Sequence, residues 1–177
     1  MKNTLLPALI LLFVHTSYAQ WTWEDPLPQG HGITSVCIID STDVWAAGTA
    51  STLLHYKGAG TWERVEVCPD KFYIFQSIKA FQSDDIWLVG TNFDSSRVYH
   101  FDGIEWTLTT EMDGVLLAAE WLSPTDAWAV GLSGLIVHFN GNNWLPVAGG
   151  ATESLQDVHF TDPGHGWIVG DKGTILF

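Results

Sequence analysis

The stretch 119–144, AEWLSPTDAWAVGLSGLIVHFNGNNW, holds the clearest copy of a phrase that recurs along the chain. The phrase W-x-[VA]-G starts at Trp45, Trp87, Trp128 and Trp167, at intervals of 42, 41 and 39 residues. A near-constant period of this length is the signature of a repeat protein. Each copy is therefore expected to fold as one unit of an array.

Within each copy, short apolar runs alternate with turns. In the copy quoted above, AAEWL leads through SPTD to WAVG, and LIVHF leads through NGNN to a strand that begins at Trp144. Short runs rich in Val, Ile, Leu and aromatic residues, separated by Gly, Asp, Asn and Ser, are typical of strands and turns. We expect four short antiparallel strands in a complete copy and almost no helix.

A small four-stranded sheet that is apolar on both faces has to be covered on both sides. Packing such sheets face to face around an axis achieves this, so the sequence predicts an all-β protein, a β-propeller with one blade per copy. The expected blades are 33–68, 75–110 and 116–150, with a partial fourth blade at 155–177. Residues 20–25 would be an outer strand of a missing or closing blade. The incomplete fourth copy favours a truncated piece of a larger ring over a closed four-bladed ring.

The residues that mark the repeat are expected to have structural roles. The tryptophans would fill the space between blades, and the glycine ending each phrase, such as Gly131, would adopt backbone angles closed to other residues. The aspartate two residues before each of the first three tryptophans, such as Asp126, would cap a turn through backbone amides. Equivalent histidines in different blades, His55, His100 and His138, lie too far apart to share a metal, and no calcium-loop motif exists, so no metal or cofactor is expected.

The phrase W-x-V-G-x-x-G-x-I-x-H-[FY]-x-G-x-x-W, complete at 128–144, resembles the repeat of bacterial propellers described as photosystem II stability or assembly factor-like. Those propellers are themselves similar to BNR repeats, the sialidase-type repeats with an Asp-box. The resemblance covers the chain after residue 19 and implies the propeller architecture. The Asp-box is degenerate, since His55, Lys57 and Ala59 replace its Ser, Asp and Gly.

Enzymatic activity finds little support in the sequence. A sialidase needs three converging arginines, and this chain has only Arg64 and Arg97, in different copies. Other glycosidases need two facing carboxylates, and no spacing singles out candidates such as Glu120 and Asp157. We interpret the protein as a non-enzymatic binding or scaffolding module for a protein or glycan. The alternative is a fragment of a sialidase-like or other glycoside hydrolase whose catalytic residues lie beyond residue 177.

Two groups of residues are candidate binding positions. The first lies at the joint between blades one and two and in the turn after the second strand of blade two, where aromatic side chains are costly unless packed or used in contact. The second is a position on each inner strand that varies between copies and could line a polar central channel or be solvated. The first group is Phe72, Tyr73, Asn92, Phe93 and Asp94, and the second is Lys79, Glu120 and His159, with Cys37 at the equivalent place in blade one.

The first 19 residues have the pattern of a secretory signal peptide, with Lys2, an apolar run at 5–14 and the small-residue exit Ser17-Tyr18-Ala19. That run is about half the length of a membrane span. We expect cleavage before Gln20 and a secreted, periplasmic or cell-surface protein with no membrane insertion. The formal net charge is −13, and −14 once Lys2 is removed, which disfavours binding to nucleic acid or anionic lipid.

Export would permit a disulfide between Cys37 and Cys68. However, Cys37 is expected on the inner strand of blade one and Cys68 at the end of the outer strand, about 14 Å away at three strand spacings. A disulfide requires Cα atoms within about 7 Å. Two separate thiols are therefore expected.

Overall fold

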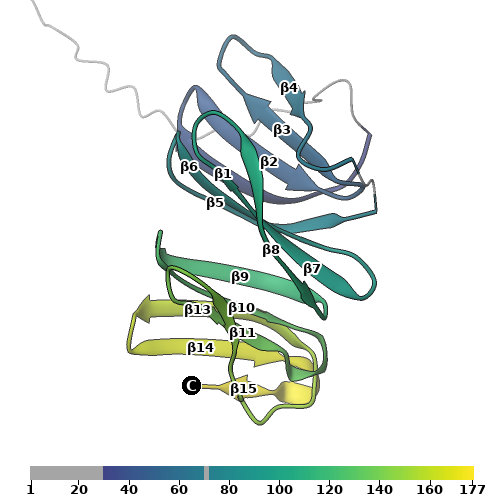
Figure 1. The fold of residues 1–177 in the computed structure, drawn as a ribbon, viewed down its shortest axis with the longest axis vertical. Coiled ribbons are helices and arrows are strands. Elements are labelled where there is room, and N and C mark those ends of the chain that lie inside the picture. The colour runs from purple at the N-terminus through teal and green to yellow at the C-terminus, as the bar shows by residue number, and fades with distance from the viewer. Residues whose placement is uncertain (1–29, 70–71) are drawn as a thin grey trace, which may run out of the picture.

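The computed structural model describes residues 30–69 and 72–177, so the predicted signal peptide and the predicted strand at 20–25 lie outside the described residues. The described part consists of strands in four antiparallel sheets and two one-turn 3-10 elements (Figure 1). No helix in this part is long and apolar enough to cross a bilayer. The all-β prediction is confirmed, and each sheet is one blade.

Each blade is built from strands that are consecutive along the chain. Blade one contains β1 (Ile33–Asp40), β2 (Asp43–Gly48), β3 (Thr52–Tyr56) and β4 (Trp62–Val65). Blade two contains β5 (Ile74–Gln82), β6 (Asp85–Thr91), β7 (Ser95–Phe101) and β8 (Trp106–Asp113). Blade three contains β9 (Leu116–Ser123), β10 (Asp126–Gly131), η1 (Leu132–Gly134), β11 (Ile136–Phe139) and β12 (Trp144–Pro146). Blade four contains β13 (Leu155–Asp162), β14 (His165–Gly170), η2 (Asp171–Gly173) and β15 (Ile175–Leu176).

The blades follow one another in an open arc. Strand β1 packs against β5, β5 against β9 and β9 against β13, so the first strands are the inner ones. Blade one lies at the top of Figure 1 and blade four at the bottom. The described chain is therefore a partial β-propeller, as the sequence predicts.

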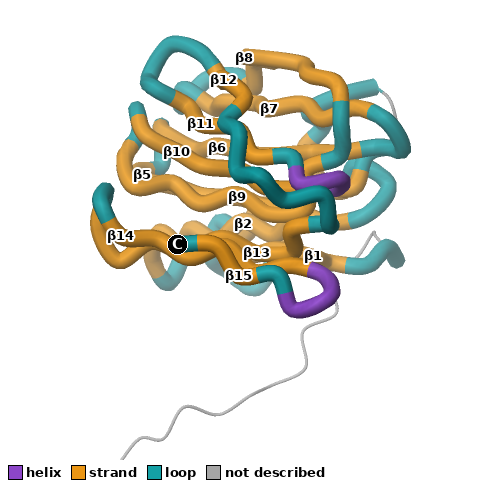
Figure 2. The backbone as a smooth tube through the Cα atoms, turned by 90° about the horizontal axis from the view of Figure 1, so that it is seen from below, coloured by secondary structure: helices purple, strands orange, loops and turns teal. Residues whose placement is uncertain are grey.

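One face of the arc collects the turns that follow the second strands. Elements η1 and η2 lie on the same side of the molecule in Figure 2. In each blade the first strand begins beside the end of the second, as Ile33 does beside Gly48, so the joints between blades lie on this side as well. We call this side the turn face.

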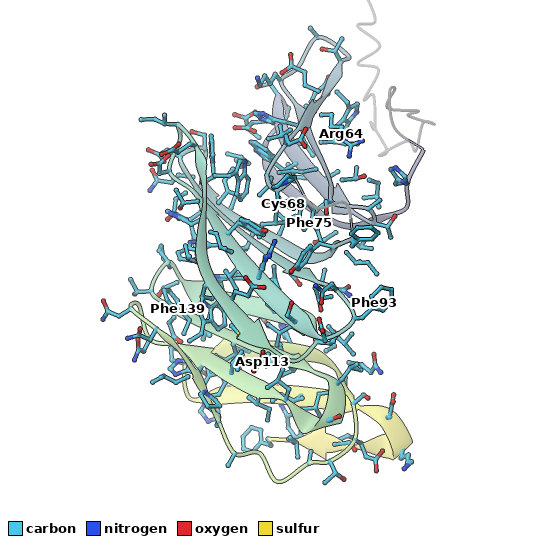
Figure 3. The ribbon with its side chains drawn as sticks, turned by 45° about the vertical axis from the view of Figure 1, so that its right-hand side comes forward. Arg64, Cys68, Phe75, Phe93, Asp113 and Phe139 are labelled. Atoms are coloured by element: carbon cyan, nitrogen blue, oxygen red, sulfur yellow. The ribbon has the colours of Figure 1, made fainter. Side chains whose placement is uncertain are left out.

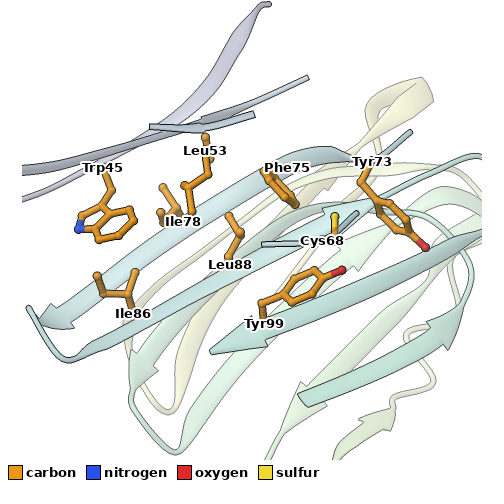
Figure 4. Packing of buried hydrophobic residues seen from close by; sticks show 10 residues of the cluster. Trp45, Leu53, Cys68, Tyr73, Phe75, Ile78, Ile86, Leu88 and Tyr99 are labelled. Carbon is orange, nitrogen blue, oxygen red and sulfur yellow. The ribbon is translucent and has the colours of Figure 1, made fainter. Parts of the chain in front are cut away.

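The repeated tryptophans fill the spaces between blades, as predicted. The ring centroid of Trp45 lies 5.7 Å from those of Phe101 and Trp106 in blade two. Figure 4 shows the buried cluster between these blades, with Trp45 near one end and Tyr73 near the other. The equivalent contact in the next pair of blades is Trp87 with Phe139 at 5.2 Å. Trp128 also contacts the next blade, through Phe160 on its first strand at 5.5 Å.

The two ends of the arc expose apolar side chains. On blade one, Val36 and Ile38 face solvent, although Ile78, the equivalent of Val36 in blade two, is buried. On blade four, Trp167 and Phe177 are exposed and contact one another at 4.7 Å between ring centroids. Each end therefore presents the kind of surface that a neighbouring blade covers elsewhere in the described chain.

The repeated aspartates and histidines bond to one another. His55 Nε2 lies 2.8 Å from an Asp43 carboxylate oxygen, and the imidazole stacks on Trp45 with 3.8 Å between ring centroids. The pair recurs as His100 with Asp85 at 2.9 Å and His138 with Asp126 at 2.8 Å. The prediction that these aspartates cap turns is wrong, because in the described residues their carboxylates bond to cross-strand histidines and not to backbone amides. In blade one it is Asp40 that caps the turn, accepting from the Thr42 amide at 2.6 Å.

The glycine that ends each repeated phrase has a different role from the one predicted. Gly131 has φ −168° and ψ −155°, an extended conformation that any residue can adopt. What excludes a side chain is crowding, since a Cβ at Gly131 would collide with the Val115 carbonyl oxygen. A Cβ at Gly48 would likewise collide with the Gly32 carbonyl oxygen. The second strand thus passes directly against the backbone that enters the blade.

Candidate functional site

A cavity of about 660 Å³ opens on the turn face where blade one joins blade two. Four of the five residues in the first predicted group line it, and the fifth, Phe93, lies in the adjacent β6–β7 turn. We call the cavity together with Phe93 the joint groove. The lining residues are Phe72, Tyr73, Asn92, Asp94, Ser95, Arg97, Glu111 and Asp113.

Tyr73 forms a fixed wall of the joint groove. Its carbonyl accepts from the Ser51 amide at 2.7 Å, and its own amide donates to Ser51 Oγ at 3.3 Å. These two bonds tie the joint to the β2–β3 turn, and the Tyr73 ring is buried. Figure 4 places Tyr73 at the same end of the buried cluster as Tyr99 and Cys68. Burial raises the pKa of the Tyr99 phenol above its usual value.

Arg97 extends along the same wall and is engaged on two sides. Its guanidinium carbon lies 4.6 Å from the centroid of the Tyr73 ring, a cation–π distance. Its Nε lies 3.2 Å from Glu111 Oε2 on the neighbouring strand β8. The charge of Arg97 is therefore balanced within the wall itself.

The β6–β7 turn is organised by one side chain. Asn92 Oδ1 accepts from the amides of Asp94 at 3.0 Å and Ser95 at 2.8 Å, which holds the turn in an Asx conformation. Phe93 sits at the tip and is 94% exposed, and Figure 3 shows it projecting from the edge of the molecule. Phe72 is 78% exposed at the joint. Packing against the blades therefore accounts for an aromatic side chain at Tyr73, which is buried, but not at Phe72 or Phe93, which are exposed.

The second predicted group lies on the inner strands beside a smaller cavity of about 320 Å³. All three of its members line this cavity, but Glu120 is used between blades: its Oε2 accepts from the Phe160 amide at 3.0 Å and lies 3.1 Å from His159 Nδ1. Cys37 Sγ likewise accepts from the Ala80 amide of blade two at 3.0 Å. Lys79 remains exposed. The variable inner-strand position therefore links neighbouring blades through Cys37 and Glu120. Its polar side chains can be explained without a central channel.

The carboxylates considered for catalysis share that smaller cavity. Asp157 lines it with Glu120, but its Oδ1 accepts from the Val158 amide at 2.9 Å. One oxygen of each carboxylate thus accepts a hydrogen bond from a backbone amide. In residues 30–69 and 72–177, no group of three or more His, Cys, Asp or Glu side chains could hold a metal ion, and no disulfide joins Cys37 to Cys68.

Sequence reasoning missed four lining residues of the joint groove. Strand register brings them there, since Ser95 pairs with Asp113 and Arg97 pairs with Glu111 across β7 and β8. The outer strand β8 runs to Asp113, past the expected end of blade two at residue 110. The sequence offered one signal: acidic residues alternate with Met112 at the end of this strand, in Glu111-Met112-Asp113.

No protein-family model and no curated protein matches the sequence. Solved structures do match the fold. The structure of YCF48 bound to D1 peptide matches with a TM-score of 0.65 and 24% identity, over 83% of this chain and 49% of that chain. YCF48 from Cyanidioschyzon merolae matches with a TM-score of 0.65 and 20% identity, over 84% and 53%. A protein of unknown function from Bacteroides caccae matches with a TM-score of 0.59 and 9% identity, over 88% and 63%.

These matches confirm the resemblance to assembly-factor-like propellers at the level of the fold. This chain spans about half the length of the two YCF48 chains. The fold is that of a β-propeller, of which the described residues form four consecutive blades, the last with three strands.

Proposed function

We propose that this partial β-propeller is a non-enzymatic module that binds a protein segment in the joint groove. The observation that carries the proposal is the exposure of two phenylalanine rings, Phe72 and Phe93, at a cavity with a rigid wall. Exposed aromatic side chains at a preformed hollow are the usual anchors of protein recognition. Tyr73 and Arg97 already hold the wall in place, which limits the conformational entropy lost on binding.

A protein ligand is favoured over a glycan by the structural similarity to YCF48, one solved structure of which is of YCF48 bound to D1 peptide. Hydrolysis by Glu120 and Asp157 themselves is not favoured, since each already accepts a hydrogen bond from a backbone amide. We further propose that the module acts outside the cytoplasm after cleavage before Gln20. N-terminal sequencing of the exported product would test that cleavage, and a product that retains Met1 in the cytoplasm would contradict it.

The binding proposal can be tested with peptides selected by display on the mature chain. The variant Phe72→Ala/Phe93→Ala should bind the selected peptides at least about tenfold more weakly, because hot-spot aromatics typically contribute more than 1 kcal/mol each. Fluorescence anisotropy would give the dissociation constants. Ile104→Ala is the matched control, since Ile104 is also an exposed apolar residue but lies in the β7–β8 turn, away from the joint groove.

The control variant should bind as the parent does, and all variants should melt at similar temperatures, because none of these side chains is buried. Peptide binding that is insensitive to the double substitution would contradict the proposal. So would selective binding to a glycan array with no binding to any displayed peptide.

A further inference from the structure

The charges around the joint groove are unequal. Its lining contains three carboxylates, on Asp94, Glu111 and Asp113, and one cationic group, on Arg97. The formal charge of the lining is therefore −2. Glu111 and Arg97 neutralise one another at 3.2 Å, so the excess negative charge belongs to Asp94 and Asp113.

Backbone pairing holds these two acidic residues next to each other. The Asp94 carbonyl accepts from the Gly114 amide at 2.8 Å, and Ser95 pairs with Asp113 across β7 and β8. Within the described residues, neither carboxylate makes a hydrogen bond or ion pair with another side chain. Like charges on adjacent strands repel one another and destabilise the sheet. Among residues 30–69 and 72–177, two neighbouring carboxylates that line a cavity therefore have no side chain that neutralises them.

The cavity that these carboxylates line also has an exposed aromatic ring. Phe72 lines the same cavity and is largely exposed. A cation held over an aromatic face and next to a carboxylate gains from both interactions, and the gain is larger where the site is partly shielded from water. An anion would meet the opposite conditions, because the only guanidinium of the lining is already engaged by Glu111 and Tyr73.

We propose that the joint groove binds the cationic side chain of a lysine or arginine in a partner segment, seated between Phe72 and the carboxylates of Asp94 and Asp113. This inference rests on the proposed function and specifies its partner as a basic peptide segment. Phe93 and Phe72 supply apolar contact, and the two aspartates supply the preference for positive charge. The excess of acidic residues over the whole chain, with a net charge of −13, would also speed the approach of a basic partner.

The test uses acetylated and amidated nonapeptides of one scaffold, GSFSXSFSG, in which X is Arg, Lys, Gln, Met or Glu. At low ionic strength, the Arg and Lys peptides should bind the mature chain at least about tenfold more tightly than the Gln and Met peptides, and the Glu peptide most weakly. The preference should shrink to about twofold or less in 0.5 M salt, because screening shortens the range of the interaction. Anisotropy of a fluorescent label gives each dissociation constant.

The variant Asp94→Asn/Asp113→Asn should lose the preference for Arg and Lys without losing stability, because it removes a repulsion and leaves the Asn92 turn intact. The control Glu153→Gln/Asp171→Asn removes the same charge at the far end of the arc, in and before blade four, and should keep the preference. Thermal melting of each variant separates loss of binding from loss of folding.

Three results would overturn the inference: no preference among the five peptides, a preference that survives Asp94→Asn/Asp113→Asn, or no binding of any nonapeptide. If the Arg and Gln peptides bind equally and Phe72→Ala/Phe93→Ala weakens both, the inference falls and the proposed function stands. If display selection also yields no peptide, both fall.

Discussion

Replacing Trp45 or Trp87 by alanine is expected to lower the free energy of unfolding by about 3 to 5 kcal/mol, the range for truncating a large buried aromatic side chain. Trp45 is 2% exposed and Trp87 is 7% exposed, and each is enclosed by the next blade. Urea denaturation followed by circular dichroism would measure the change. Loss of the side chain leaves a cavity between two sheets that cannot close without moving the blades.

Trp167→Ala is the internal control for this prediction. It has the same position in the repeat, but its side chain is 52% exposed at the end of the arc. We expect a loss of about 1 kcal/mol or less, as for most partly exposed sites. Equal losses at Trp45 and Trp167 would mean that the blades do not pack in the order described.

Gly131→Ala should also be strongly destabilising, by about 3 kcal/mol, at the upper end of the range for overpacking. The added Cβ would meet the Val115 carbonyl oxygen, a backbone atom that cannot rotate away. That oxygen also accepts from the Leu132 amide at 2.9 Å, so a shift of Val115 would break the bond between the joint and the turn.

Gly30→Ala provides the comparison, because nothing lies within 4 Å of a Cβ built there. Its effect should stay within about 0.5 kcal/mol. If Gly131→Ala were equally harmless in thermal and urea unfolding, the close approach of β10 to the start of blade three would be incorrect.

The period of the sequence was sufficient to predict the blades and the order of their strands, because turn residues and apolar runs recur locally in every copy. The bonding partners of individual side chains could not be predicted from this period. Asp126 bonds to His138 and Gly131 lies against Val115, and both contacts join residues at least twelve positions apart. One signal was available: in the fourth copy His165 and Phe177 replace the aspartate and the histidine together, as a bonded pair would.

The candidate site, too, could be predicted from the sequence only in part. Phe72, Tyr73 and the β6–β7 turn were identifiable because they differ from the repeat and lie at a joint. Arg97 and Glu111 were not, since only the register of β7 against β8 places them at the same cavity. The position of Glu120 varies between copies, which suggested a side chain that lines a channel or is solvated. Glu120 instead bonds to the backbone of blade four.

A crystal structure of the mature chain with the arginine nonapeptide would show directly where the peptide binds. We expect the peptide to lie in the joint groove, with its guanidinium about 3 Å from the carboxylates of Asp94 and Asp113 and in contact with the Phe72 ring. A peptide bound instead beside Lys79, or against the exposed end faces at Val36 or Trp167, would contradict it.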